Sequence, residues 1–285
     1  GFDGADLAMR DLIAMGAMEG PRMFVSGAGI RFMTYRKPSA AVSVAEAKKL
    51  TQSLIDSGVD WIKVYASTGI ADDLTGNQTV SHDEMKAIID TAHAAGKKVA
   101  VHSYGPDAAR DAISLGADTL EHATDMDDAT IAELARKKIW YIPTINHNRH
   151  YLDHADDVYK FTPEAKRNFA DYIARNVATA QKAYRAGVRM LAGSDAVYTA
   201  FGTNMQELEW FVKIGMSNEQ ALRAATVGPA EMLGQEKTLG AVAPGFAADL
   251  VAVEGDPLAD IRAVTENVRW VMKAGSVMVD KTRAR

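Results

Sequence analysis

The sequence predicts an α/β protein: an incomplete (β/α)8 barrel, the TIM barrel architecture, followed by a small β annex. Three observations support this prediction. Short apolar runs alternate with amphipathic helical segments, which is the pattern of a parallel sheet built from βαβ units. Polar residues lie in or at the end of several apolar runs, and a barrel brings such strand ends together around one axis. Beyond residue 235 the helical segments give way to short β runs and turns.

The segments between the apolar runs carry helix-start signals. Ser43-Val44-Ala45-Glu46 and Ser81-His82-Asp83-Glu84 are capping-box patterns, and Thr162-Pro163 is a cap residue followed by proline at the first helical position. A complete barrel has eight strands in about 250 residues. We therefore expect residues 1–235 to form strands three to eight of a barrel, preceded by a helix over Asp6–Met18. The candidate strands are Met23–Ser26, Trp61–Ala66, Lys98–His102, Thr119–His122, Trp140–Thr144 and Met190–Gly193.

Residues 236–285 have the texture of a separate small β domain. The run Leu239–Gly245 is rich in turn residues. Three short β runs follow it: Asp249–Val253, Val268–Met272 and Ser276–Val279. Three such strands bury too little apolar surface to be stable alone, so we expect them to pack against further structure.

Composition excludes several classes of function. A formal net charge of −5 without a long basic run argues against nucleic-acid binding. No apolar stretch is long enough to span a bilayer, so a membrane protein is not expected, and the compartment stays open between cytoplasm and periplasm or secretion. The absence of cysteine excludes disulfides and thiolate ligands. A metal site would have to use histidine, carboxylates or a modified residue.

Lys63 is the least expected residue of the barrel segment, because it lies in the apolar run Asp60-Trp61-Ile62-Lys63-Val64-Tyr65-Ala66. Side chains of a strand alternate between its faces, so Lys63 shares one face with Trp61 and Tyr65. We expect both faces to be buried, as in parallel sheets covered by helices. A buried ammonium group is unfavourable unless it is paired or chemically altered. Lys63 is therefore predicted to be reactive or to carry an altered charge.

Three further polar residues end apolar runs: His102, His122 and Asp195. A single histidine at a strand end is commonly a hydrogen-bonded structural residue, and an aspartate after a strand is commonly a helix N-cap. Two histidines at the ends of consecutive strands, aimed at one axis, favour a metal site. Asp195 would then be a carboxylate that contacts a metal ion and transfers protons.

Two chemistries place a lysine on an inner barrel strand. One is a Schiff-base lyase or aldolase, in which Lys63 attacks a carbonyl group. The other is a lysine carbamate, formed from Lys63 and CO2, whose negative charge bridges two metal ions. The second chemistry accounts better for the strand-end histidines and aspartate, which a Schiff-base enzyme does not need. A third alternative is a non-catalytic remnant that retains the fold without a working metal site.

Four motifs resemble those of the amidohydrolase superfamily, in its imidazolonepropionase-like branch with Xaa-Pro-type dipeptidases and ochratoxinase-like amidases. They are Ile62-Lys63-Val64-Tyr65-Ala66-Ser67, Val101-His102-Ser103-Tyr104-Gly105, Leu120-Glu121-His122 and Ala192-Gly193-Ser194-Asp195. The run from Leu239 to Val251 is similar to the family's return to its β-sandwich domain. The resemblance implies a barrel of the metal-dependent hydrolase type, with residues 236–285 as the C-terminal part of a β-sandwich.

The resemblance also implies an activity and a role for each motif residue. The protein would be a dipeptidase, carboxypeptidase or amidase that cleaves a dipeptide or N-acyl amino acid with metal-activated water. Lys63 would be carboxylated and bridge two divalent ions, usually zinc, in a binuclear centre. His102 and His122 would hold the more exposed ion, and Asp195 would bind the buried ion and carry the proton. The expected partners are a small-molecule substrate and further copies of the chain in a homo-oligomer.

The sequence departs from the family pattern in one respect: it contains no His-x-His pair, which in the family ends the first barrel strand. His147 and the two histidines after it have a different spacing and follow the predicted seventh strand. We therefore expect the chain to correspond to the C-terminal two-thirds of an amidohydrolase and to bind the buried ion poorly by itself. Tyr104, His147 and Arg149 are candidate substrate-binding residues, because they follow strand ends.

Overall fold

The computed structural model describes residues 4–31, 33–34, 37–38, 43–69, 74–196 and 200–282. The chain forms two compact units, Gly1–Tyr141 and Ile142–Arg285. The predicted boundary between barrel and β annex, at residue 235, falls inside the second unit and stays a prediction.

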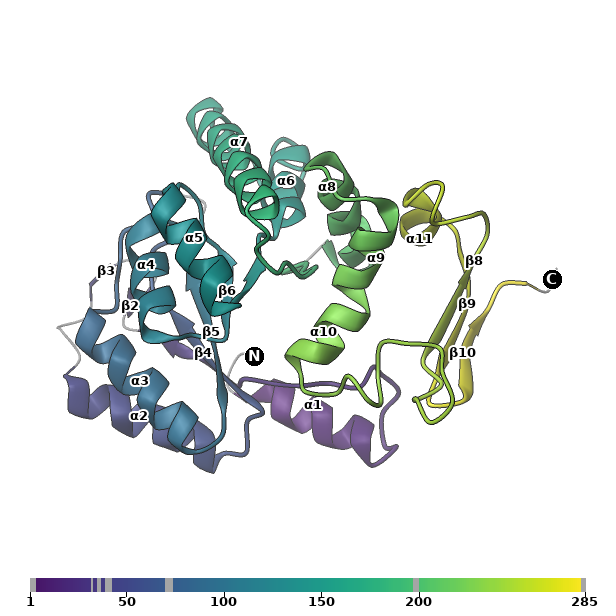
Figure 1. The fold of residues 1–285 in the computed structure, drawn as a ribbon, viewed down its shortest axis with the longest axis horizontal. Coiled ribbons are helices and arrows are strands. Elements are labelled where there is room, and N and C mark those ends of the chain that lie inside the picture. The colour runs from purple at the N-terminus through teal and green to yellow at the C-terminus, as the bar shows by residue number, and fades with distance from the viewer. Residues whose placement is uncertain are drawn as a thin grey trace. The chain divides into compact units, whose positions relative to one another are not determined.

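A five-stranded sheet runs through the first unit in the order β1-β4-β5-β6-β7 (Figure 1). The pairs β1–β4, β4–β5 and β5–β6 are parallel, which confirms the predicted architecture. A separate antiparallel ribbon, β2 (Met33–Thr34) and β3 (Lys37–Pro38), lies between β1 and β4 in the chain. The strands of the sheet are β1 (Ile30–Arg31), β4 (Trp61–Tyr65), β5 (Lys98–Ser103), β6 (Thr119–His122) and β7 (Trp140–Ile142).

The helices between these strands, α2 to α5, pack side by side in chain order along one side of the sheet (Figure 1), whereas α1 precedes β1 in the chain. The capping box predicted at Ser81 and Glu84 is complete, whereas at Ser43 the structure shows only the side-chain cap on the N–H of Glu46. Gly116 ends α4 in the left-handed conformation at φ 84°. The predicted helix near the start of the chain is also present. The helices are α1 (Ala5–Ala14), α2 (Val44–Asp56), α3 (His82–Ala94), α4 (Pro106–Leu115) and α5 (Asp128–Lys137).

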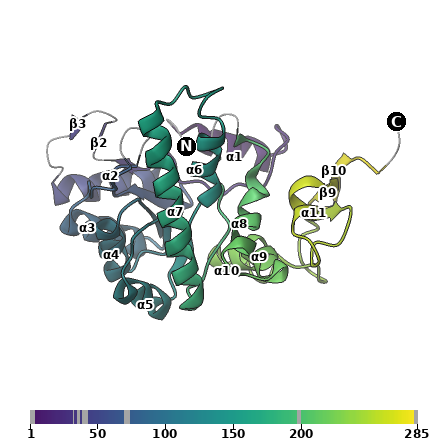
Figure 2. The same cartoon turned by 90° about the horizontal axis from the view of Figure 1, so that it is seen from above.

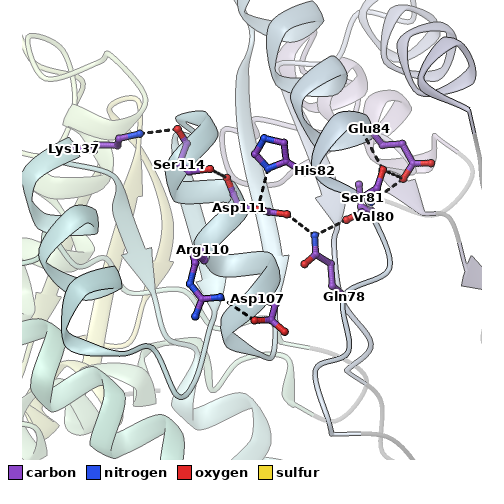
Figure 3. Close-up of polar contacts among 10 residues, drawn as sticks. All are labelled: Gln78, Val80, Ser81, His82, Glu84, Asp107, Arg110, Asp111, Ser114 and Lys137. Carbon is purple, nitrogen blue, oxygen red and sulfur yellow. Dashed lines mark hydrogen bonds and ion pairs between the residues drawn. The ribbon is translucent and has the colours of Figure 1, made fainter.

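The loop that follows β4 is anchored to α4 by side-chain hydrogen bonds (Figure 3). Gln78 Nε2 donates to Asp111 Oδ2 at 2.7 Å and to the carbonyl of Val80 at 2.7 Å. Asp111 Oδ1 also lies 3.0 Å from Nδ1 of His82, at the start of α3. The backbone of Gln78 forms an antiparallel bridge with Ser67, just beyond β4. These contacts hold the described end of the loop beside the carboxyl end of β4, which lies two residues after Lys63.

The predicted strand Met23–Ser26 is wrong, because the sheet begins instead at β1, with Ile30 and Arg31. Gly27 and Gly29 have φ values of 64° and 71°, so the chain turns between the two segments. The N–H of Val25 is taken by the Asp60 carboxylate at 2.8 Å rather than by a neighbouring strand. Local apolar character identified the right region but not the residues that pair.

The predicted strand Met190–Gly193 is also wrong, since only Met190 makes a β-bridge. The N–H of Ala192 donates to the carbonyl of Ala224, 2.9 Å away at the end of a helix. The hydrogen bonds of this extended segment therefore go partly to a helix terminus, which an apolar sequence run cannot reveal.

The second unit contains the helices that follow β7 and the C-terminal sheet. The long helix α7 packs beside α6 (Figure 2). The three predicted annex strands are confirmed as an antiparallel sheet in the order β10-β9-β8. The helices and strands of the second unit are α6 (Ile145–Asp153), α7 (Pro163–Arg185), η2 (Asn204–Gln206), α8 (Glu207–Lys213), α9 (Asn218–Ala225), α10 (Val227–Met232), β8 (Leu250–Val253), α11 (Arg262–Glu266), β9 (Val268–Lys273) and β10 (Ser276–Asp280).

Strand β4 shows how the core positions the candidate site. Ile62 and Val64 are fully buried, whereas Trp61, Lys63 and Tyr65 on the other face are only partly buried. The expectation that both faces are completely buried is therefore wrong for the lysine face.

Among the described residues, no helix has the length and apolar character needed to cross a membrane.

Candidate active site

Lys63 is paired with a carboxylate that the sequence reasoning did not single out. Its Nζ forms an ion pair with Oε2 of Glu121 on β6, and the side chains are 17% and 11% exposed. Thr119 Oγ1 donates to the other carboxylate oxygen. Register explains the meeting: Lys63 aligns with Ala100, which aligns with Thr119, so Lys63, Thr119 and Glu121 share one face of the sheet. In this state the lysine charge is neutralised by an ion pair.

Two imidazoles lie together at the carboxyl ends of β5 and β6. The ring centroids of His102 and His122 are 4.7 Å apart, and the residues are only 8% and 4% exposed. Tyr65 and Tyr104 flank the pair, with centroids 5.4 and 5.1 Å from that of His102. The predicted convergence of the two histidines is therefore present within the first unit.

His122 reaches His102 because its backbone leaves the regular strand conformation. In register it aligns with Ser103, whose side chain alternates with that of His102. His122 has a φ of 69°, in the left-handed region that non-glycine residues rarely adopt. The buried hydroxyl of Tyr141 donates to the carbonyls of His122 and Ala123 at 3.0 and 2.8 Å. Such unfavourable backbone conformations concentrate at functional sites, where surrounding contacts hold them.

Tyr104 is held between the two histidine strands and the loop after β4. It is 4% exposed, its ring centroid lies 4.9 Å from that of His122, and its N–H donates to Ser67 Oγ at 2.8 Å. A Cβ atom at Gly69 would come within 2.2 Å of the Tyr104 ring. The glycine thus leaves room for the tyrosine. The substrate-binding role of Tyr104 stays a prediction.

Gly76 provides a direct test of this packing. A Cβ there would lie 2.3 Å from the backbone nitrogen of Gly105, and Gly76 has a φ of 70°. We expect Gly76→Ala to lower the free energy of unfolding by about 2–3 kcal/mol, because it adds a backbone clash to left-handed strain. The matched control is Gly96→Ala, which has nearly the same φ of 69° but open space around the added methyl group. We expect the control to lose about 1 kcal/mol in urea unfolding. Equal losses for the two variants would contradict the clash.

The second unit places His147 beside Asp195. His147 Nε2 lies 3.3 Å from Asp195 Oδ2; the His147 side chain is 9% exposed and that of Asp195 is 47% exposed. Asp195 has a φ of 42°, which turns it out of the extended segment before it. The sequence identified both residues separately but did not predict that they touch.

Glu207 is a second carboxylate that the sequence reasoning missed. It is fully buried, and its two oxygens accept the backbone N–H groups of Ile145 and Asn146 at 2.9 and 2.8 Å. Burial raises the pKa of the Glu207 carboxyl to about 7, against the lowering effect of these two hydrogen bonds. A glutamate at the start of a short amphipathic helix gives no sequence signal for such a position.

The remaining candidate, Arg149, lies on α6 with a half-exposed side chain that forms an ion pair with Asp153. Its role in substrate binding stays a prediction. The structure therefore brings Lys63, His102, His122 and Tyr104 together in the first unit, and His147 and Asp195 together in the second. That Asp195 joins the first group at one site also stays a prediction.

The metal ions implied by the sequence resemblance fit these residues only in part. The close, buried pair His102 and His122 supplies two imidazole donors. Lys63 is an ammonium group paired with Glu121 in this structure, so it becomes a donor only after carboxylation. Within the part of the chain that the structure describes, no three histidine or acidic side chains are grouped as a metal site. The described residues thus supply two ligands of one ion rather than a complete binuclear centre.

Comparison with known proteins places these features in a family. The model of the amidohydrolase family matches residues 3–278. Ochratoxinase of Aspergillus niger is 29% identical over 243 residues, which are 83% of this chain and 50% of that protein. An uncharacterised protein of Mycobacterium tuberculosis is 33% identical over 182 residues, or 62% of this chain and 47% of that protein. The chain spans about half the length of these curated relatives.

Similarity extends to the three-dimensional fold. A Xaa-Pro dipeptidase crystallised with methionine in its active site is 28% identical, with a TM-score of 0.86, over 97% of this chain and 73% of that one. This agreement confirms the TIM-barrel type of fold predicted from the alternating pattern. Because the family model covers nearly the whole sequence and the fold agrees with it, the chain belongs to the amidohydrolase family.

Proposed function

We propose that the protein is a metal-dependent hydrolase that cleaves an amide or peptide bond in a small dipeptide or N-acyl amino acid. The observation that carries the proposal is the buried imidazole pair His102 and His122, whose ring centroids lie 4.7 Å apart at two neighbouring strand ends. Lys63 lies on the same face of the sheet as His102. Membership of the amidohydrolase family and likeness to a Xaa-Pro dipeptidase support the choice of bond.

Each residue of the proposed site has a distinct task. His102, His122 and a carboxylated Lys63 would hold one divalent ion, zinc in the simplest case, and Asp195 would contribute to a second. Divalent ions, when bound, would supply Lewis acidity and lower the pKa of a coordinated water molecule to near neutrality. Asp195 accepts the proton of the attacking water and returns it to the leaving amine. Its half-exposed carboxylate and the neighbouring His147 imidazole suit this exchange.

Carboxylation changes the electrostatics around Lys63. The ion pair with Glu121 is favourable only while Lys63 is a cation. A carbamate anion there would repel the Glu121 carboxylate unless metal ions neutralise the added charge. Carboxylation and metal binding are therefore expected to occur together, and bicarbonate should promote metal binding.

Metal content is the test of this proposal. In a protein where a His-x-His pair accompanies these residues, we expect about two divalent ions per chain after zinc and bicarbonate are supplied, by the two-metal logic of such hydrolases. Elemental analysis measures the ions, and hydrolysis of a panel of Xaa-Pro dipeptides and N-acyl amino acids measures the activity. Removing the metal with a chelator should abolish hydrolysis, and zinc, manganese or cobalt should restore it.

Two outcomes would contradict the proposal. Full hydrolysis by metal-free protein would exclude metal-activated water. No hydrolysis of any panel member, with zinc and bicarbonate bound, would indicate a fold that has lost catalysis.

A further inference from the structure

One short segment, residues 204–210, contacts both parts of the second unit that carry proposed site residues. It comprises η2 and the first turn of α8. Its side chains reach the N-terminus of α6, which carries His147, and the segment that carries Asp195. We call it the 204–210 brace.

The first set of contacts holds the start of α6. Thr144, at the N-cap position, has a φ of 49° and makes no side-chain cap hydrogen bond. Glu207 caps the helix instead: its oxygens accept the N–H groups of Ile145, 62 residues earlier in the chain, and of Asn146, 61 residues earlier. The Asn146 side chain is bound on both sides, by Gln206 and by Nε1 of Trp210, each at 3.3 Å. The next residue along α6 is His147, so these contacts fix the backbone that carries its imidazole.

The second contact holds the backbone before Asp195. Asn204 Nδ2 donates to Ser194 Oγ at 2.9 Å, and Ser194 Oγ also accepts the N–H of Ala196 at 3.3 Å. Asp195 lies between Ser194 and Ala196 in the chain and has a φ of 42°. Non-glycine residues keep such a conformation only when surrounding contacts impose it. The brace therefore acts on both members of the 3.3 Å contact between His147 and Asp195.

We propose that Glu207 and Asn204 are positioning residues of the reaction: together they set the geometry of the His147–Asp195 pair. This inference rests on the proposed function, in which Asp195 carries the proton. Complete burial of the Glu207 carboxylate, with both oxygens used by backbone N–H groups, means that no neighbouring solvent can replace it. Loss of either oxygen leaves an N–H at the start of α6 without its acceptor.

The test compares Glu207→Gln with Glu209→Gln in the metal-loaded protein. Glutamine at position 207 retains one acceptor oxygen and replaces the other with an NH2 group, which cannot accept a hydrogen bond. We expect kcat to fall about ten- to a hundredfold while KM changes less than about threefold, because misplacing a catalytic group by about 1 Å acts on the chemical step. Amide hydrogen exchange at Ile145 and Asn146 should accelerate.

Glu209→Gln is the matched control. It makes the same substitution in the same helix, and its Oε1 can still accept the hydrogen bond that Thr265 Oγ1 gives Glu209 at 3.0 Å. We expect kcat, KM and exchange on α6 to stay at wild-type values. Asn204→Ala tests the contact with Ser194. Because the Asn204 side chain is partly exposed, we expect this variant to fold, and it should lower kcat without accelerating amide exchange at Ile145.

Several outcomes overturn the inference. Unchanged kcat in both Glu207→Gln and Asn204→Ala would show that the brace serves stability alone. If the wild-type protein hydrolyses nothing, the proposed function fails. The NMR signals of the His147 imidazole then test, independently of activity, whether Glu207 positions His147. Those signals should shift in Glu207→Gln and stay fixed in Glu209→Gln; identical spectra for wild type and Glu207→Gln would overturn it.

Discussion

Replacing Lys63 with alanine is expected to reduce hydrolysis by a factor on the order of 10³ or more, since removal of the proposed carbamate would forfeit several kcal/mol of transition-state stabilisation. Short carboxylic acids such as acetate should restore part of the activity, because they could take the place of the proposed carbamate. The measurement is kcat/KM with and without added acid. Unchanged activity in Lys63→Ala would contradict the role of this lysine.

Stability must be separated from chemistry in this experiment. Lys63→Ala leaves the largely buried Glu121 carboxylate without its partner, which is expected to cost about 2–4 kcal/mol of folding free energy. The double variant Lys63→Ala/Glu121→Gln removes the uncompensated charge, so it should recover stability but remain inactive. Lys98→Ala is the matched control: Lys98 lies on the neighbouring strand β5, with its Nζ 5.5 Å from the Trp61 ring centroid.

The Schiff-base alternative makes a different prediction for the same lysine. Borohydride reduction in the presence of a carbonyl substrate would then attach the substrate to Lys63, and peptide mapping would locate the adduct. We expect no adduct, since a carbamate nitrogen does not attack carbonyl groups. An adduct on Lys63 would replace the hydrolase proposal with a lyase.

Asp195→Asn is expected to abolish turnover, by about 10²–10⁴-fold in kcat, while the fold stays intact. Asparagine keeps the shape of the side chain but cannot accept the proton of the attacking water. Asparagine also tolerates the left-handed backbone that Asp195 adopts at φ 42°, so no strain is added. Circular dichroism and thermal unfolding check the fold, and single-turnover kinetics check the chemical step.

The control for this variant is Asp125→Asn. Asp125 is exposed and has a φ of 58°, so it matches Asp195 in residue type and in backbone conformation. We expect wild-type kcat from the control. A rate near wild type in Asp195→Asn would refute its part in proton transfer and leave it as a structural residue beside His147.

Strand-end residues on regular elements were accessible from the sequence. Alternation along β4 placed Lys63 on the face opposite the buried Ile62 and Val64, and the apolar runs before His102 and His122 located both strand ends. These features depend on local periodicity, which is a property of a few consecutive residues. The same reasoning failed at Met23–Ser26 and Met190–Gly193, where the glycine turns and hydrogen bonds to distant groups decided the pairing.

Contacts between distant residues were not accessible. Glu121 meets Lys63 across 58 residues of sequence, and Glu207 meets Ile145 across 62. Each is an acidic residue in an otherwise ordinary strand or helix, and only the register of the sheet or the packing of helices determines which backbone or side chain it contacts. The turn at His122 belongs to the same group, because the buried Tyr141 hydroxyl supports it from β7.

The sequence by itself determined the parallel α/β architecture, the annex strands and the identity of the candidate lysine, histidines and aspartate, because short-range periodicity and residue chemistry encode them. Only the tertiary structure decided that Lys63 is paired with Glu121, that His102 and His122 meet through a left-handed turn, and that His147 touches Asp195 beside a brace. These contacts join segments far apart in the chain, and packing of the whole fold, rather than any local preference, selects them.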